Sequence, residues 1–154
     1  MASLHQTPFS DNPVRAVLLL GCRILLGLVL IAHGWQKLTI IGIDGVAAQM
    51  ARSGVPVPTL AAIVAATIEF VGGICILLGL FTWVAGSLVA LLMAGAYAFV
   101  HRGNGVLVDN GGWELVAAIG VAALLLALTS PGDLSLDQAL SAPHGRPRRR
   151  GRRS

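Results

Sequence analysis

The stretch TLAAIVAATIEFVGGICILLGL, residues 59–80, decides the fold of this chain. It contains a single charged side chain, Glu69, and shows no regular alternation of apolar and polar residues. As a helix rising ~1.5 Å per residue it would be ~33 Å long, enough to cross the ~30 Å hydrocarbon layer of a bilayer. We therefore predict a membrane-spanning helix at this position.

Similar apolar runs occupy residues 14–32, 83–100 and 112–128. Of the 154 residues, 55% are hydrophobic and 12% are charged, and runs of this length leave no polar face for water. Only Phe81-Thr82 separates the second run from the third, which predicts a tight antiparallel hairpin. The sequence therefore indicates an all-α polytopic membrane protein, a four-helix antiparallel bundle whose surroundings are the lipid bilayer.

The chain divides into a polar lead at residues 1–13, a membrane domain at 14–140 and a basic tail at 141–154. Glycines and prolines interrupt the connection at 38–58, where we expect a short interfacial helix at 46–52. A second short segment, 134–140, could lie along the membrane.

Six arginines between residues 146 and 154 set the expected orientation. The positive-inside rule puts this tail in the cytoplasm, and an even number of spans brings the N-terminus to the same side. No aromatic residues interleave with the arginines, so attraction to anionic lipid is favoured over nucleic-acid binding.

Small residues on the second and third runs predict close helix packing, since they let two backbones approach. They are Gly72, Gly73, Gly86, Ala90 and Ala94. The two cysteines, Cys22 and Cys75, are interpreted as small buried hydrophobes in preference to a redox pair.

Arg23 and Glu69 are charged residues inside apolar runs, where a single charge is costly. Counting helix rise from Arg15 and Leu80 as inner edges gives depths of ~12 Å and ~16 Å. We therefore predict an intramembrane ion pair between Arg23 and Glu69. A structural clamp is favoured over a direct role in proton or ligand handling.

A second polar group is expected near the outer face. The same count brings His33, His101 and Glu114 to one level, ~24 to 28 Å up, with Lys37 one helical turn beyond His33. These side chains could form a pocket for a quinone head group, whose carbonyls need hydrogen-bond donors and a proton-transferring neighbour. The alternative is that they are ordinary snorkelling residues at the interface.

Other cofactors are less well supported. No spacing in the chain resembles a metal-binding motif, and no catalytic residue can be singled out. Two histidines on different helices could hold haem, but such ligands are usually deeper and more enclosed by apolar surfaces.

The chain resembles the DoxX family of small bacterial membrane proteins from about Arg15 to Asp137. The order and spacing of several short motifs carry the resemblance. Trp83 departs from it, because family members usually have arginine or a similar residue there. The motifs are Arg23-x-x-x-Gly27, His33-Gly34-x-x-Lys37, Glu69-x-x-Gly72-Gly73, Leu78-Gly79-Leu80 with Thr82, His101, Gly111–Glu114 and Pro131-Gly132-x-x-Ser135-Leu136-Asp137.

The resemblance implies a multi-pass inner-membrane subunit associated with oxidoreduction. Some relatives belong to thiosulfate:quinone oxidoreductase or terminal quinol oxidase assemblies. In mycobacteria the family is linked to superoxide dismutase and a thiosulfate sulfurtransferase in thiol and oxidative stress defence. Quinone is the implied ligand. A non-catalytic scaffold and a small-molecule permease are the alternatives, and homo-oligomerisation stays open.

Overall fold

The computed structural model describes residues 13–129, 132 and 134–141. The regular elements within these ranges are all helical. They are α1 (Pro13–Trp35), α2 (Ile43–Arg52), α3 (Pro58–Leu78), α4 (Thr82–Ala96), α5 (Glu114–Leu128) and α6 (Leu136–Ser141), with π-helical turns η1 (Gln36–Ile40) and η2 (Tyr97–His101) and a 3₁₀ turn η3 (Val108–Asn110). Nearly all of the predicted polar lead and of the arginine tail lies outside the described residues.

Three helical segments are long and apolar enough to cross a membrane: Pro13–Ile40, Pro58–Leu78 and Thr82–His101. The fourth predicted span is the shorter apolar helix α5, whose 15 residues extend ~22 Å. The prediction of an all-α polytopic protein is confirmed. The first segment is longer than predicted, because η1 continues α1 without a break to 28 residues.

The hairpin between α3 and α4 is as tight as the sequence predicted. Gly79 ends α3 in the left-handed conformation with φ 67°, which a residue without Cβ adopts at little cost. The N–H of Leu80 returns to the carbonyl of Cys75 at 2.8 Å, a Schellman-type end. Helix α4 starts at Thr82, so the two helices are joined with almost no free chain.

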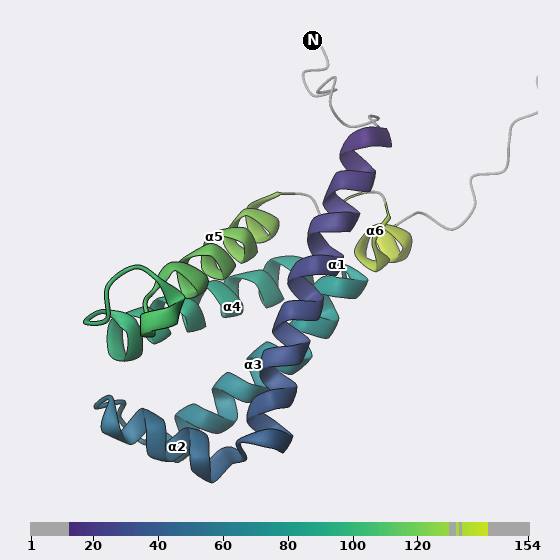
Figure 1. The fold of residues 1–154 in the computed structure, drawn as a ribbon. Coiled ribbons are helices and arrows are strands. Elements are labelled where there is room, and N and C mark those ends of the chain that lie inside the picture. Colours follow the sequence, from purple (N-terminus) through teal and green to yellow (C-terminus); the bar gives the residue numbers. More distant parts are fainter. Residues whose placement is uncertain (1–12, 130–131, 133, 142–154) are drawn as a thin grey trace, which may run out of the picture.

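Helices α1 and α3 pack closely through glycines (Figure 1). A Cβ atom on Gly34 would lie 2.5 Å from the backbone nitrogen of Phe70, and one on Gly73 would lie 2.9 Å from that of Ile31. These contacts hold the two backbones against each other and fix their register. A side chain at either glycine would force the helices apart.

Helices α4 and α5 form a second close pair (Figure 1). A Cβ on Gly86 would lie 2.6 Å from the carbonyl oxygen of Ala123, and one on Gly72 of α3 would lie 3.4 Å from the Val89 side chain of α4. The core between the pairs consists of buried aliphatic side chains. These are Leu26, Leu30, Ile76, Ala85, Val89, Met93, Ile119, Ala123 and Leu126.

Both short segments expected from the sequence contain helices. Helix α2 packs through Val46 and Ala47 on Ala62 of α3, at the end of the molecule away from the α3–α4 turn. Helix α6 lies at the other end, where Asp137 bonds to the start of α4.

Candidate functional site

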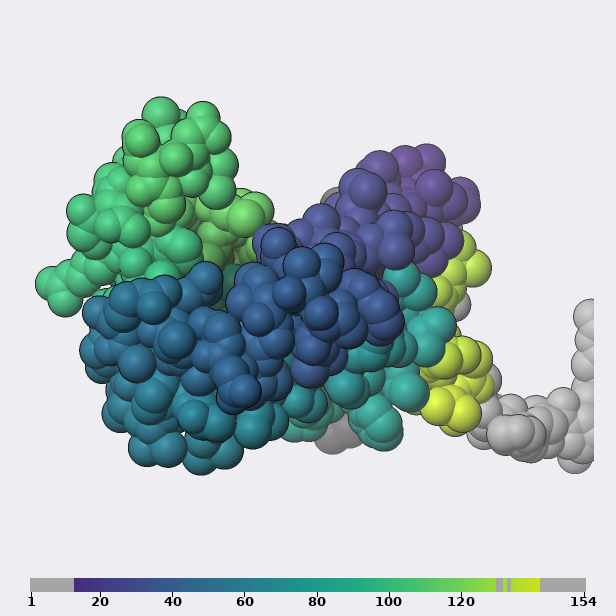
Figure 2. Space-filling model, turned by 60° about the horizontal axis from the view of Figure 1, so that its bottom comes forward, coloured from purple at the N-terminus to yellow at the C-terminus, as the bar shows by residue number. Residues whose placement is uncertain are grey.

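A cavity of about 650 Å³ lies between α1, α2, α3, α4 and α5, and we call it the central cavity. Its walls are almost entirely aliphatic, with Phe99 as their aromatic member. The exceptions are five polar side chains: His33, Lys37, Gln49, Glu69 and His101. Figure 2 shows the indentation at this end of the molecule, with the blue α2 region on one side and the green segment near residues 100–115 on the other.

An ion pair crosses from η1 to α3 at the edge of this cavity. The Lys37 Nζ lies 2.5 Å from the Glu69 Oε2, and the side chains are 21% and 7% exposed. Both residues belong to segments long enough to span the membrane. Each charge is therefore compensated where it would otherwise be costly.

The structure does not form the predicted pair between Arg23 and Glu69. Gly34 of α1 lies against Phe70 of α3, and Gly27 lies against Leu77, so Arg23 is level with the end of α3. The sequence count had placed Arg15 at that level, an error of about eight residues or ~12 Å of helix. Glu69 is therefore too far from Arg23. It pairs instead with Lys37, which lies in η1 after the end of α1.

Arg23 instead closes the C-terminal end of α3. Its guanidinium donates hydrogen bonds to the carbonyl oxygens of Ile76 at 3.2 Å, Leu77 at 3.3 Å and Leu134 at 3.0 Å. The last carbonyls of a helix have no partner within it, so a cation there supplies both hydrogen bonds and favourable charge. Arg23 is 2% exposed.

Asp137 of α6 performs the complementary task at the start of α4. Its carboxylate accepts hydrogen bonds from the N–H groups of Phe81 at 2.8 Å and Thr82 at 3.0 Å, and from the Thr82 hydroxyl at 3.1 Å. Burial raises the pKa of this carboxyl, but these hydrogen bonds and the Arg23 charge outweigh burial and hold the pKa below its ordinary value. We call Arg23 and Asp137 the clasp.

His33 and His101 both line the central cavity, as predicted with Lys37, whereas Glu114 does not. The Glu114 Oε1 accepts a hydrogen bond from the Val108 N–H at 2.7 Å and so holds the loop before α5. His101 also supports this loop, through a bond of 2.6 Å from its Nδ1 to the Gly111 carbonyl oxygen. Three of the four residues predicted for the outer pocket thus share one cavity.

The two π-helical turns were missed by sequence reasoning. Lys37 lies in η1 and His101 in η2, and both turns border the central cavity. A π-turn shifts the residues after it around the helix axis, and such turns are frequent at functional sites. No residue pattern in either segment distinguishes it from ordinary α-helix.

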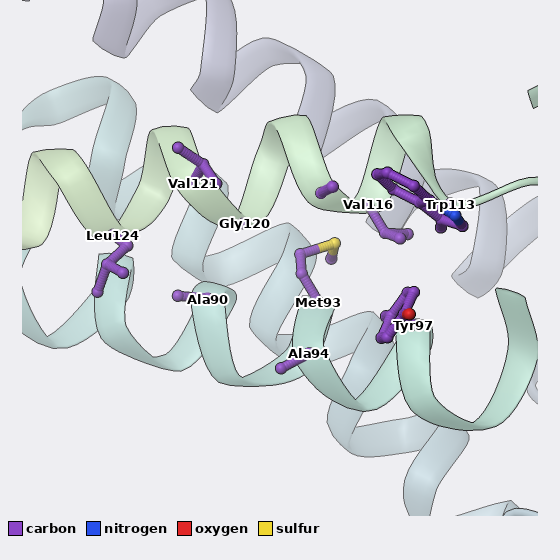
Figure 3. A pocket seen from close by; sticks show the side chains of 10 residues that line it. Ala90, Met93, Ala94, Tyr97, Trp113, Val116, Gly120, Val121 and Leu124 are labelled. Atoms are coloured by element: carbon purple, nitrogen blue, oxygen red, sulfur yellow. The ribbon is translucent and has the colours of Figure 1, made fainter. Parts of the chain in front are cut away.

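A second hollow, of about 380 Å³, lies between α4 and α5. Figure 3 shows Tyr97 and Trp113 facing each other at one end of it and Ala90 and Leu124 towards the other. The two rings meet edge to face with centroids 6.2 Å apart. Apart from the tyrosine phenol its lining has no ionisable group, so the central cavity is the better candidate site.

Metal ligands do not gather in the part of the chain that the structure describes: no group of three His, Cys, Asp or Glu side chains there could hold an ion. Cys22 is exposed and Cys75 is partly buried, and both thiols are free. The central cavity itself offers charged and hydrogen-bonding side chains inside an apolar space.

Comparison with known proteins agrees with this architecture. The DoxX family model matches residues 18–102, which include Arg23, Lys37, Glu69 and His101. A curated relative, "Inner membrane protein YphA" of Escherichia coli (strain K12), is 38% identical over 136 residues, covering 84% of this chain and 95% of the relative. No solved structure matches the chain.

The relative and the apolar helices together support a multi-pass inner-membrane protein embedded in the lipid bilayer. The family match covers more than half of the chain, and the relative is similar over nearly its whole length. The chain belongs to the DoxX family.

Proposed function

We propose that this protein binds a lipid-soluble ligand of the quinone type inside the membrane, as the membrane subunit of an oxidoreductase complex. The observation that carries the proposal is the composition of the central cavity, where an ammonium, a carboxylate and two imidazoles share an otherwise apolar space. A quinone has an apolar tail and a head group whose carbonyl oxygens need hydrogen-bond donors. The two parts of the ligand match the two parts of the cavity.

The size and hydrogen-bonding capacity of the cavity support this ligand class. Its volume of about 650 Å³ is within the ordinary range of small-molecule sites. The Lys37 ammonium carries three protons, and one hydrogen bond to Glu69 leaves others for a ligand oxygen.

The walls of the cavity also reach the outer surface. Val64, Leu91 and Phe99 line the cavity and are 43%, 71% and 50% exposed. In a membrane these side chains would contact lipid, so a ligand dissolved in the bilayer could enter from the side without passing through water.

Binding can be tested on the full-length protein in mild detergent. Bound lipid is extracted and assayed for quinone, and the protein is then titrated with a decyl-benzoquinone while tryptophan fluorescence is followed. The double variant Lys37→Met/Glu69→Leu removes both charges at similar side-chain volume, so we expect it to fold and to bind at least ~10-fold more weakly.

Arg52→Met is the matched control, because Arg52 is an exposed cation of α2 that does not line the central cavity. We expect its affinity to equal that of the wild type. Absence of co-purified quinone together with no saturable binding would refute the proposal. Co-purification of soluble redox enzymes, such as a superoxide dismutase or a sulfurtransferase, without quinone would then favour the scaffold.

We further propose that α5 is the fourth crossing and that both termini face the cytoplasm. The arginine tail supports this side. The clasp supports a common side for the two ends, because Arg23, in the first half of α1, binds Leu134 just before α6. Phosphatase and fluorescent-protein fusions at each terminus test it. Fluorescence from both fusions is expected, and phosphatase activity at either end would contradict the proposal.

A further inference from the structure

The imidazole of His101 has a defined hydrogen-bonding polarity. Its Nδ1 lies 2.6 Å from the carbonyl oxygen of Gly111. A carbonyl oxygen can only accept, so the proton of this bond must be on Nδ1. The Asn104 side-chain amide donates to the same oxygen at 3.2 Å, which occupies its second lone pair.

The other ring nitrogen is consequently a hydrogen-bond acceptor in the neutral histidine. With Nδ1 protonated, Nε2 carries a lone pair and no proton. His101 lines the central cavity, and within the described ranges the bond to Gly111 is the one hydrogen bond of its ring. The acceptor nitrogen is therefore available to a ligand.

Two of the polar groups that line the central cavity, besides the Glu69 carboxylate already paired with Lys37, have opposite hydrogen-bonding character. Lys37, on η1, can only donate hydrogen bonds, whereas the Nε2 of His101, on η2, accepts one. A quinone offers oxygen acceptors alone and so satisfies one of these two groups. A head group with both an oxygen acceptor and a hydroxyl donor satisfies both.

Resting on the proposed function, we infer that His101 is a specificity-determining residue that selects a hydroxyl-bearing head group, the hydroquinone or a related phenol, over the quinone. The ligand hydroxyl donates to Nε2 while Lys37 donates to a second ligand oxygen. Leaving a buried acceptor without a donor is what disfavours the oxidised form. The inference concerns binding alone and requires no electron transfer.

Three ligands with the same decyl tail separate the contributions: the hydroquinone, the quinone and the hydroquinone dimethyl ether, which keeps the oxygens but cannot donate. Affinities are measured anaerobically by equilibrium dialysis on the full-length protein in detergent. We expect the hydroquinone to bind about five- to tenfold more tightly than the dimethyl ether, the value of one hydrogen bond. Equal affinities for these two ligands in the wild type would overturn the inference without any variant.

The variant His101→Asn isolates the acceptor. Asparagine can place its amide N–H where Nδ1 was, keeping the bond to Gly111, but it has no atom at the Nε2 position. The preference for hydroquinone over dimethyl ether should fall to about one, while quinone affinity is retained. Asn104→Ala is the control, because it removes the other donor to Gly111 and leaves the imidazole intact; it should keep the wild-type preference.

The outcomes separate failure of the proposed function from failure of the role assigned to His101. If none of the three ligands binds the wild type, the proposed function fails. If all bind but His101→Asn keeps the preference, the inference fails and the proposed function stands. Nitrogen-15 spectroscopy of the imidazole gives an independent readout, since a proton found on Nε2 of the neutral ring would also overturn the inference.

Discussion

The ion pair between Lys37 and Glu69 leads to the sharpest prediction about stability. Removing Lys37 leaves a carboxylate that is 7% exposed, whereas removing Glu69 leaves an ammonium that is 21% exposed on a long flexible stem. Breaking a buried pair costs ~3 to 5 kcal/mol, and the better-solvated survivor suffers less. We expect Lys37→Met to cost ~4 kcal/mol of unfolding free energy and Glu69→Leu ~3 kcal/mol.

The double variant Lys37→Met/Glu69→Leu should lose less unfolding free energy than either single variant. Replacing both members of a buried pair by apolar side chains of similar size is often close to neutral, so we expect a loss of at most ~1 kcal/mol. The resulting coupling free energy is several kcal/mol. It can be measured by reversible unfolding of the detergent-solubilised protein with increasing dodecyl sulfate, followed by circular dichroism.

A second cycle pairs Glu69→Leu with Arg23→Met. Because Arg23 bonds to carbonyl oxygens at the end of α3, these two substitutions should be additive within ~0.5 kcal/mol. Strong coupling in this cycle, or a coupling below ~0.5 kcal/mol between Lys37 and Glu69, would refute the pairing described above.

Three further predictions concern packing, pH and the loop before α5. Gly34→Val should sharply lower the yield of folded protein, costing more than ~2 kcal/mol by pushing α1 from α3, whereas Gly21→Val, which meets no atom within 4 Å, should be well tolerated in thermal unfolding assays. Asp137→Ala should cost ~1 kcal/mol as a lost helix cap. Because the folded pKa of Asp137 lies below its ordinary 3.8, its contribution is present above that pH and lost as the pH falls, so the unfolding temperature of the variant should depend less on pH below about 5 than that of the wild type. Glu114→Leu should speed proteolysis of the loop around Val108 by removing its hydrogen bond, with Glu114→Gln, which can still accept, close to the wild type.

The helices could be predicted from the sequence because their cause is local. An apolar run long enough to span a bilayer must satisfy its backbone internally, and Gly79 at the end of α3 marks the turn. The register between helices has a different origin. It depends on which glycine of α1 fits which backbone atom of α3, and no property of either run alone specifies that match.

The error in the candidate site follows from this difference. Assigning Arg15 and Leu80 to one membrane edge displaced α1 by about two turns. Arg23 was therefore paired with Glu69, although its guanidinium bonds to carbonyl oxygens at the end of α3. His33, Lys37 and His101 line one cavity, since each of the three lies near the end of an apolar run. Their role in binding a ligand stays a prediction. Glu114 failed as a site residue because its own loop supplies a backbone N–H within reach.

Because the connection between α3 and α4 is short, a change in the angle between these helices would displace their far ends most. The clasp fixes both helices at their joined ends, while the central cavity lies between the opposite ends, where α3 contributes Val64 and η2, which continues α4, contributes Phe99. Helix α3 is ~32 Å long, so a change of about 5° in the angle between the two helices would move its far end by ~3 Å. We therefore expect a change at α6 to widen or narrow the central cavity, although no residue of α6 lines it.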